Sequence, residues 1–124
     1  MHYHRILFVD DNLWSNMENC EFLRWSSYNV SGVYCAAEAL KLIANGEPWS
    51  ALVTDIDLGL GMDGFDVARH ARMSYPHLPV VFISGGETAP ERARGVAESE
   101  FIAKPFRPRQ LVEALCRALP RQAA

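Results

Sequence analysis

The sequence predicts an α/β protein built on a five-stranded parallel sheet, and two patterns support this fold class. Short apolar runs alternate with stretches of helical periodicity along the whole chain. Three of these runs, at residues 6–9, 51–54 and 80–83, are almost continuously apolar, which is typical of strands buried on both faces of a sheet. Strands that alternate with helices form right-handed βαβ units, so we expect a single parallel sheet covered by helices.

The first strand is expected at residues 6–9, and it ends at Asp10 and Asp11. Asn12 or Asp11 can cap the helix that follows, because a short polar side chain accepts hydrogen bonds from free backbone N–H groups at a helix start. Four residues recur in this helix at i, i+4, i+7 and i+10. We expect them to form its apolar face: Leu13, Met17, Cys20 and Leu23.

The middle of the chain continues the alternation of strands and helices. Residues 28–33 are expected to form the second strand, and a helix over residues 36–44 is stopped by Asn45 and Gly46. The third strand, at residues 51–54, ends in Asp55. A helix over residues 65–73 follows and is closed by Pro76 and Pro79.

The last part of the chain supplies two strands and two helices. The fourth strand, at residues 80–83, ends at Ser84. The helix expected at about residues 90–97 is the weakest, because Gly95 costs it about 1 kcal/mol relative to Ala. A short fifth strand at residues 101–102 runs into Lys104 and Pro105. The last helix is expected to bury Leu111, Ala114, Leu115 and Ala118.

Composition and charge limit the classes of function. The chain has 124 residues, 49% of them apolar, which suits one domain with one core. Its net charge of −3 argues against a nucleic-acid-binding protein, and no run approaches the roughly 18–20 apolar residues of a membrane span. Cys20, Cys35 and Cys116 lack metal-ligand spacing and are expected to be reduced interior residues. We therefore expect a soluble, cytoplasmic protein with neither a membrane nor a nucleic-acid partner.

Polar side chains follow the ends of four of the predicted strands. Ligands of open α/β sheets bind at the carboxyl ends of the strands, so these side chains should meet at one edge of the sheet. The residues are Asp10, Asp11, Asp55, Ser84 and Lys104. Each one alone is more simply explained as a helix cap, a turn hydroxyl or a surface charge. Their occurrence at successive strand ends favours a functional site.

The carboxylates in this set indicate a cation site. Two unit charges about 4 Å apart repel by about 4 kcal/mol at an effective dielectric constant near 20, so three carboxylates need a counter-ion. Mg²⁺ takes oxygen ligands, commonly carboxylates together with water and a phosphate oxygen. With Asp55 as nucleophile, Lys104 as cationic partner and Ser84 as hydroxyl donor, the set provides what phosphoryl transfer requires.

The segments VDDN, TDIDLGLGMDG, ISGG and FIAKPF together resemble the response regulator receiver domains of two-component signalling. The resemblance runs from about Arg5 to Leu119. It implies a flavodoxin-like, doubly wound sheet of order 2-1-3-4-5 flanked by five helices, in a receiver domain of residues 1–124 with no attached output domain. It also implies a phosphoprotein that catalyses only its own aspartyl phosphorylation and dephosphorylation and is not otherwise an enzyme.

The resemblance also implies how the phosphorylation site works. Asp55 would be the phosphoacceptor, which takes the group from a sensor histidine kinase or a histidine phosphotransfer protein. Mg²⁺ would be bound by Asp11, by Asp10 through water, and by Asp55. The backbone carbonyl of Asp57 would complete the protein ligands.

A switch and a signalling surface are implied in the same way. Ser84 and Lys104 would sense the phosphoryl group, and Phe101 would be the switch aromatic that turns inward as Ser84 moves. Pro105 would follow a cis peptide bond. A downstream protein effector would dock on the face formed by the helix at 90–97, the fifth strand and the last helix. The rim of that face would include Arg107, Arg109 and Gln110.

Three features depart from the family pattern. The segment Gly59-Leu60-Gly61 stands where the family often has a proline, and the loop after Asp55 looks one residue longer. The span from Ser84 to Lys104 looks one or two residues short, which indicates a short or irregular helix there. Phe101 lacks the hydroxyl of the more common tyrosine.

Two other functions remain open from the sequence. Asp55-x-Asp57 after a strand is also the motif of aspartyl phosphatases of the haloacid dehalogenase type, although there it normally follows the first strand of a longer chain. A receiver-like interaction module that no longer accepts phosphate is the second alternative. The presence of all five chemical groups disfavours it.

Overall fold

A computed structural model describes residues 3–85 and 96–120. Within them lie the strands β1 (Arg5–Val9), β2 (Asn29–Val33), β3 (Ala51–Asp55), β4 (Val80–Ser84) and β5 (Ser99–Ala103). The helices are α1 (Leu13–Trp25), α2 (Ala36–Ala44), α3 (Gly64–Ser74) and α4 (Pro108–Ala118). The helix expected at about 90–97 falls largely outside the described residues, so α4 corresponds to the last helix of the sequence prediction.

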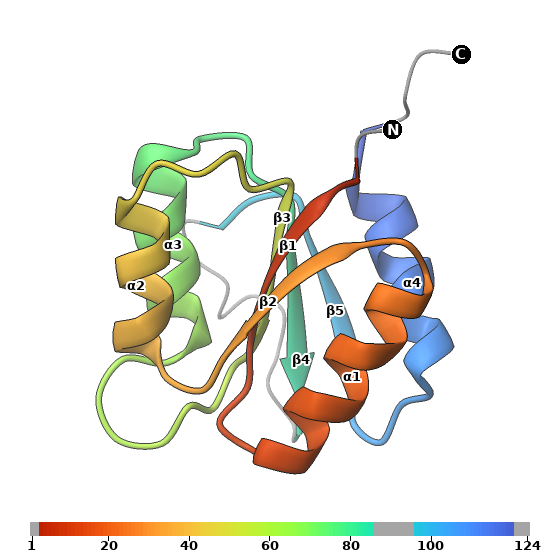
Figure 1. The fold of residues 1–124 in the computed structure, drawn as a ribbon. Coiled ribbons are helices and arrows are strands. Elements are labelled where there is room, and N and C mark those ends of the chain that lie inside the picture. Colours follow the sequence, from red (N-terminus) through yellow and green to blue (C-terminus); the bar gives the residue numbers. More distant parts are fainter. Residues whose placement is uncertain (1–2, 86–95, 121–124) are drawn as a thin grey trace.

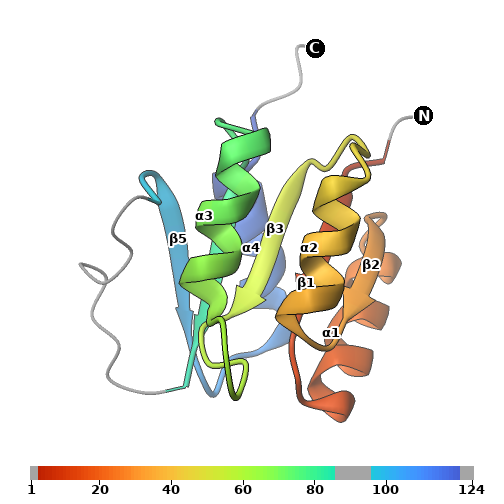
Figure 2. The ribbon, with the colours of Figure 1, turned by 90° about the vertical axis from the view of Figure 1, so that its left-hand side faces the viewer.

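All five strands pair in parallel in the order β2-β1-β3-β4-β5, as Figure 1 shows. Helices α1 and α4 cover one face of the sheet, and α2 and α3 cover the other (Figures 1 and 2). This arrangement confirms the flavodoxin-like, doubly wound sheet. Because the strands run in one direction, their carboxyl ends lie along a single edge.

The central strands are buried on both faces, which explains their continuously apolar sequences. Strands β3 and β4 are buried at every residue, and β1 is buried at every residue except Arg5. Successive residues of a strand point to opposite faces, so each strand contributes to two clusters. Leu7 and Phe82 pack with residues of α2 and α3, whereas Ile6 and Phe8 pack with residues of α1 and α4.

Helix α1 buries Cys20 and Leu23 as expected, but not the other two residues of the predicted apolar face. Leu13 and Met17 are 55% and 52% exposed, so the prediction that they pack against the sheet is wrong. The first turns of α1 lie beside the polar ends of β1 and β2, where backbone carbonyl groups need hydrogen-bond donors. The buried residues of α1 are Asn16, Asn19, Cys20 and Leu23.

The cysteines are also less buried than expected. All three are free thiols, but only Cys20 is buried, whereas Cys35 is half-buried and Cys116 is exposed. Cys116 follows the buried Leu115, and neighbouring residues of a helix point about 100° apart, so its thiol faces outward. The prediction of three interior cysteines is therefore wrong. No helix within residues 3–85 and 96–120 is long and apolar enough to cross a membrane.

Candidate functional site

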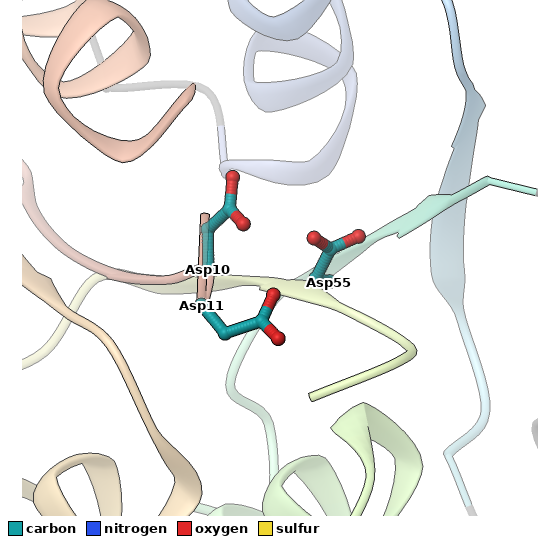
Figure 3. Close-up of side chains that lie close together, drawn as sticks. All are labelled: Asp10, Asp11 and Asp55. Atoms are coloured by element: carbon teal, nitrogen blue, oxygen red, sulfur yellow. The ribbon is translucent and has the colours of Figure 1, made fainter. Parts of the chain in front are cut away.

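Three carboxylates meet where β1 and β3 end side by side. Asp10 and Asp11 follow β1, and Asp55 is the last residue of the adjacent β3 (Figure 3). One carboxylate oxygen from each of the three lies within 4.8 Å of the others. Asp10 and Asp55 are buried, at 1% and 4% exposure, whereas Asp11 is exposed. The structure thus brings together residues that are distant in the sequence.

Lys104 reaches the same point from the end of β5. Its Nζ donates a hydrogen bond of 2.9 Å to Oδ2 of Asp55. Its backbone N–H donates to the carbonyl oxygen of Ser84 at 2.7 Å, which fixes the end of β5 against the end of β4. The peptide bond between Lys104 and Pro105 is cis, as the family resemblance implied.

The two predicted switch residues lie on the neighbouring strands β4 and β5, of which β5 is at the edge of the sheet. Ser84 ends β4 and is 6% exposed. Phe101 lies in β5 with its ring centroid 5.2 Å from that of Phe82, which in turn lies 4.8 Å from that of Phe65. The ring of Phe101 is therefore packed against the core, and a row of three aromatic rings connects β5 with the first turn of α3.

Burial raises the pKa of Asp55 from its ordinary value of 3.8 to about 7. The hydrogen bond from Lys104 lowers the pKa, while the neighbouring Asp10 raises it, so burial and like charge prevail. Burial lowers the pKa of Lys104, but the hydrogen bond and charge of Asp55 outweigh burial and raise it. Lys104 is therefore a permanent cation at neutral pH, whereas Asp55 needs added positive charge to ionise fully.

The donor set at this edge fits a hard divalent cation. Mg²⁺ binds oxygen ligands at about 2 Å, so two ligands on opposite sides of the ion are about 4 Å apart. One oxygen from each of the three carboxylates lies within 4.8 Å of the others, which is close to this separation. Oδ1 of Asp10 already accepts the N–H of Asn12 at 2.9 Å, which fixes this carboxylate in place. The side chain of Asp57 accepts the N–H of Gly59 at 3.1 Å. Asp10, Asp11 and Asp55 could therefore hold the ion.

A cavity of about 450 Å³ opens over the site. Carboxylates line one part of it and the ammonium group of Lys104 lines another, so it can accommodate a cation and an anion together. Its lining residues are Asp11, Asn12, Asp55, Ile56, Asp57, Gly85 and Lys104. Asp57, expected to offer its carbonyl, thus borders the same space.

The sequence profile of a family described as "Response regulator receiver domain" matches residues 6–116, nearly the whole chain. The chain belongs to this family. The receiver domain is 32% identical over 120 residues to the response regulator MprA of Mycobacterium sp. (strain KMS), an alignment that covers 95% of this chain and 51% of MprA. It is 32% identical over 114 residues to the sensor protein TorS of Escherichia coli (strain K12), covering 90% of this chain and 12% of TorS.

Solved structures agree with this assignment. A response regulator receiver protein from Sinorhizobium medicae WSM419 superposes with a TM-score of 0.88 and 31% identity, covering 94% of each chain. The chemotaxis protein CheY4 of Vibrio cholerae gives a TM-score of 0.84 and 26% identity, covering 95% of this chain and all of CheY4. The chain spans about half the length of MprA. The absence of an output domain therefore stays a prediction.

One residue of the receiver domain has a role at the site that the sequence did not reveal. A Cβ atom at Gly64 would collide with the carbonyl oxygen of Asp55 and lie 2.9 Å from Cα of Ile56. The N–H of Gly64 donates to the carbonyl oxygen of Ile56 at 2.7 Å, which draws the start of α3 onto the end of β3. Its only sequence signal was its place directly after Asp63, the residue that caps α3.

Proposed function

We propose that this receiver domain accepts a phosphoryl group on Asp55 from the phosphohistidine of a sensor histidine kinase or a histidine phosphotransfer protein. The observation that carries the proposal is the buried Asp55 carboxylate, which contacts Lys104 at 2.9 Å and lies beside Asp10 and Asp11. A bond forms between a carboxylate oxygen of Asp55 and phosphorus while the bond from phosphorus to the donor's imidazole nitrogen breaks. The electron pair of that bond returns to the imidazole.

The residues around Asp55 compensate the charge of this reaction. Transfer places a phosphoryl group beside two other carboxylates, and unbalanced negative charges at such distances repel by several kcal/mol. Lys104 lies close enough to pair with a phosphoryl oxygen, and Ser84 offers a hydroxyl donor from the adjacent strand. Asp10, Asp11, Asp55 and the carbonyl of Asp57 would hold Mg²⁺, which when bound shields the charge of the phosphoryl oxygens.

Phosphorylation can be tested by intact-protein mass spectrometry after incubation with phosphoramidate and Mg²⁺. We expect one added phosphoryl group on the wild type and none on Asp55→Asn. Glu21→Gln is the matched control and should be labelled like the wild type, because Glu21 is an exposed acid of α1 that does not line the cavity over Asp55. Full labelling of Asp55→Asn would overturn the assignment of the phosphoacceptor. A wild type that is never labelled would favour the interaction-module alternative.

Metal binding can be tested separately from phosphorylation. Asp11→Ala should weaken Mg²⁺ binding at least tenfold, since it removes one of three clustered carboxylates. The titration can be followed by tryptophan fluorescence, because Trp14 lies in the first turn of α1, close to Asp11 in sequence. Glu18→Ala, which removes an exposed acid of α1, is the control and should leave the titration unchanged. An unaltered midpoint for Asp11→Ala would contradict the proposed ligand set.

A surface on β5 and α4 is the proposed signalling face. A cavity of about 350 Å³ lies between these elements, and Phe101 lines it while its ring packs on Phe82. Because residues of β5 line this groove, a shift of β5 that accompanied movement of Phe101 would change the shape of the groove. The other lining residues are Ile102, Ala103, Pro105, Gln110, Glu113 and Arg117. Arg107, Arg109 and Gln110 are exposed at the start of α4, where a protein effector can reach them.

This coupling can be followed by NMR with beryllofluoride, a mimic of the phosphoryl group. Adding beryllofluoride and Mg²⁺ should shift the amide signals of Phe101 and Gln110, and Asp55→Asn should prevent the shifts. Signals of β2, at the opposite edge of the sheet, serve as the internal control. Unmoved signals on β5 and α4 in the liganded wild type would contradict this signalling face.

The haloacid dehalogenase alternative gains no support. The chain matches the receiver family over residues 6–116, and Asp55 lies on β3 rather than on the first strand. Repeated turnover of a phosphate ester by the wild type would revive that alternative, whereas a single labelling event per Asp55 fits the receiver function.

A further inference from the structure

Asn16 is a buried polar residue on the inward face of α1, with 2% of its surface exposed. Its Nδ2 atom donates two hydrogen bonds, one to the carbonyl oxygen of Asp10 at 2.9 Å and one to that of Val33 at 2.8 Å. The N–H of Asp10 also donates to the carbonyl oxygen of Val33, at 3.1 Å. One carboxamide therefore joins α1 to the ends of β1 and β2.

The other end of the Asn16 carboxamide is occupied as well. Its Oδ1 atom accepts the thiol hydrogen of Cys20 at 3.3 Å. Both hydrogens of the amide nitrogen and the oxygen thus have partners, which leaves the buried side chain a single favourable orientation.

Strand β2 leaves room for this side chain by placing a glycine opposite it. A Cβ atom at Gly32 would lie 2.6 Å from Oδ1 of Asn16 and 2.7 Å from Sγ of Cys20. Real Cβ atoms do not approach oxygen or sulfur so closely, so any larger residue at position 32 would displace the carboxamide. The pocket fits Asn16 only because Gly32 has no side chain.

The contacts of Asn16 act on the residue that carries the first carboxylate of the cation site. The backbone of Asp10 is held at its N–H by Val33 and at its carbonyl by Asn16, while its side chain accepts the N–H of Asn12. The carbonyl of Asp10 belongs to the planar peptide unit that leads to Asp11. Fixing this carbonyl therefore fixes the direction in which Asp11 leaves β1.

Asp11 depends on this arrangement because its own side chain has little support. It is exposed, and no residue of the described part of the chain donates a hydrogen bond to its carboxylate. Its position near Asp10 and Asp55 must then come from the backbone.

We propose that Asn16 is a positioning residue of the cation site, which orients the peptide between Asp10 and Asp11 so that both carboxylates face Asp55. The inference rests on the Mg²⁺ site of the proposed function. A purely structural Asn16 would affect the stability of the protein and leave the Mg²⁺ affinity of the folded molecules unchanged. The two roles therefore differ in a measurable way.

The test compares Asn16→Ala with Asn19→Ala. Asn19 is the other buried asparagine of α1, at 7% exposure, and makes no side-chain hydrogen bond within residues 3–85 and 96–120. Without metal, we expect the amide hydrogen of Asp10 to exchange at least tenfold faster in Asn16→Ala and at the wild-type rate in Asn19→Ala. With metal, we expect the dissociation constant of Mg²⁺ to rise at least tenfold in Asn16→Ala and less than twofold in Asn19→Ala.

Gly32→Ala tests the same proposal with a different substitution. It also keeps the proposal testable if Asn16→Ala does not fold. Its new Cβ should displace the carboxamide and weaken Mg²⁺ binding to a similar extent. In the Asn16→Ala background, Gly32→Ala should weaken binding little further, because the carboxamide is already gone and the Cys20 thiol can turn into the space that it leaves. Equal and independent effects of the two changes would overturn the proposal.

The remaining outcomes separate this inference from the function on which it rests. Wild-type Mg²⁺ affinity and Asp10 exchange in a folded Asn16→Ala or Gly32→Ala protein would refute the positioning role and leave the phosphoacceptor function intact. A wild-type protein that binds no Mg²⁺ would refute both.

Discussion

Without bound metal, Asp55 should make the protein less stable as the pH rises from about 4 to about 7. Its pKa is raised from 3.8 to about 7 in the folded state, first by burial and then by Asp10, against the opposing effect of Lys104. Between these pH values the folded state keeps a proton that the unfolded state has released. Since the folded state then binds more protons, the free energy of unfolding falls as the pH rises. The stability that Asp55 contributes by keeping its proton is fully present below about pH 4 and is lost as the pH rises through about 7.

The size of this effect follows from the two pKa values. A rise from 3.8 to about 7 corresponds to about 4 kcal/mol, at about 1.4 kcal/mol for each pKa unit. Asp55→Asn removes this cost because its amide is uncharged at every pH, and the opposing effect of Lys104 is already contained in the pKa of about 7. We therefore expect Asp55→Asn to stabilise the metal-free protein by up to about 4 kcal/mol more at pH 8 than at pH 4.

Urea denaturation in EDTA at several pH values measures this difference directly. The gain from Asp55→Asn should be close to zero or negative at pH 4 and should grow until about pH 8. Asn19→Ala, which changes no ionisable group, should show no such trend. Saturating Mg²⁺ should stabilise the wild type, because it binds only the folded state, and should stabilise Asp55→Asn less. A difference between wild type and Asp55→Asn that is the same from pH 4 to pH 8 would refute the reasoning.

Four further substitutions test other parts of the structure. Lys104→Met should raise the pKa of Asp55 above about 7 in a carbon-13 NMR titration, because it removes the group that lowers it, and a fall would contradict this. Gly64→Ala should cost roughly 2 kcal/mol or more in urea denaturation, since its Cβ meets the rigid backbone of β3; a neutral change would show that α3 can move away. Phe8→Ala should cost about 3–5 kcal/mol in the same assay, as expected for a fully buried aromatic ring. Arg117→Ala should cost less than about 1 kcal/mol, because its ion pair with Glu100 is largely exposed, and a larger loss would indicate a structural role for that pair.

The strands and the site were predictable because both follow from simple patterns. Continuous apolar runs indicated β1, β3 and β4, and the polar residue after each run marked the edge where the candidate site lies. Parallel pairing then required that Asp10, Asp55 and Lys104 come together, although they are far apart in the sequence.

The parts that sequence patterns missed depend on contacts between distant segments. The apolar periodicity of α1 pointed to Leu13 and Met17, but the helix buries Asn16 because the carbonyl groups at the ends of β1 and β2 need donors. Hydrophobic periodicity cannot identify a polar side chain that is buried for its hydrogen bonds. The collision that excludes a side chain at Gly64 likewise involves backbone atoms of β3, whose distance from α3 only the folded chain defines.

The hydrogen bond between Asp55 and Lys104 spans 49 residues of sequence, and the strand that delivers the lysine is added to the sheet last in chain order. A chain that ends before residue 104 would keep the three clustered carboxylates but lack the ammonium group that pairs with Asp55. The charge balance at this edge is therefore complete only when β5 has joined the sheet.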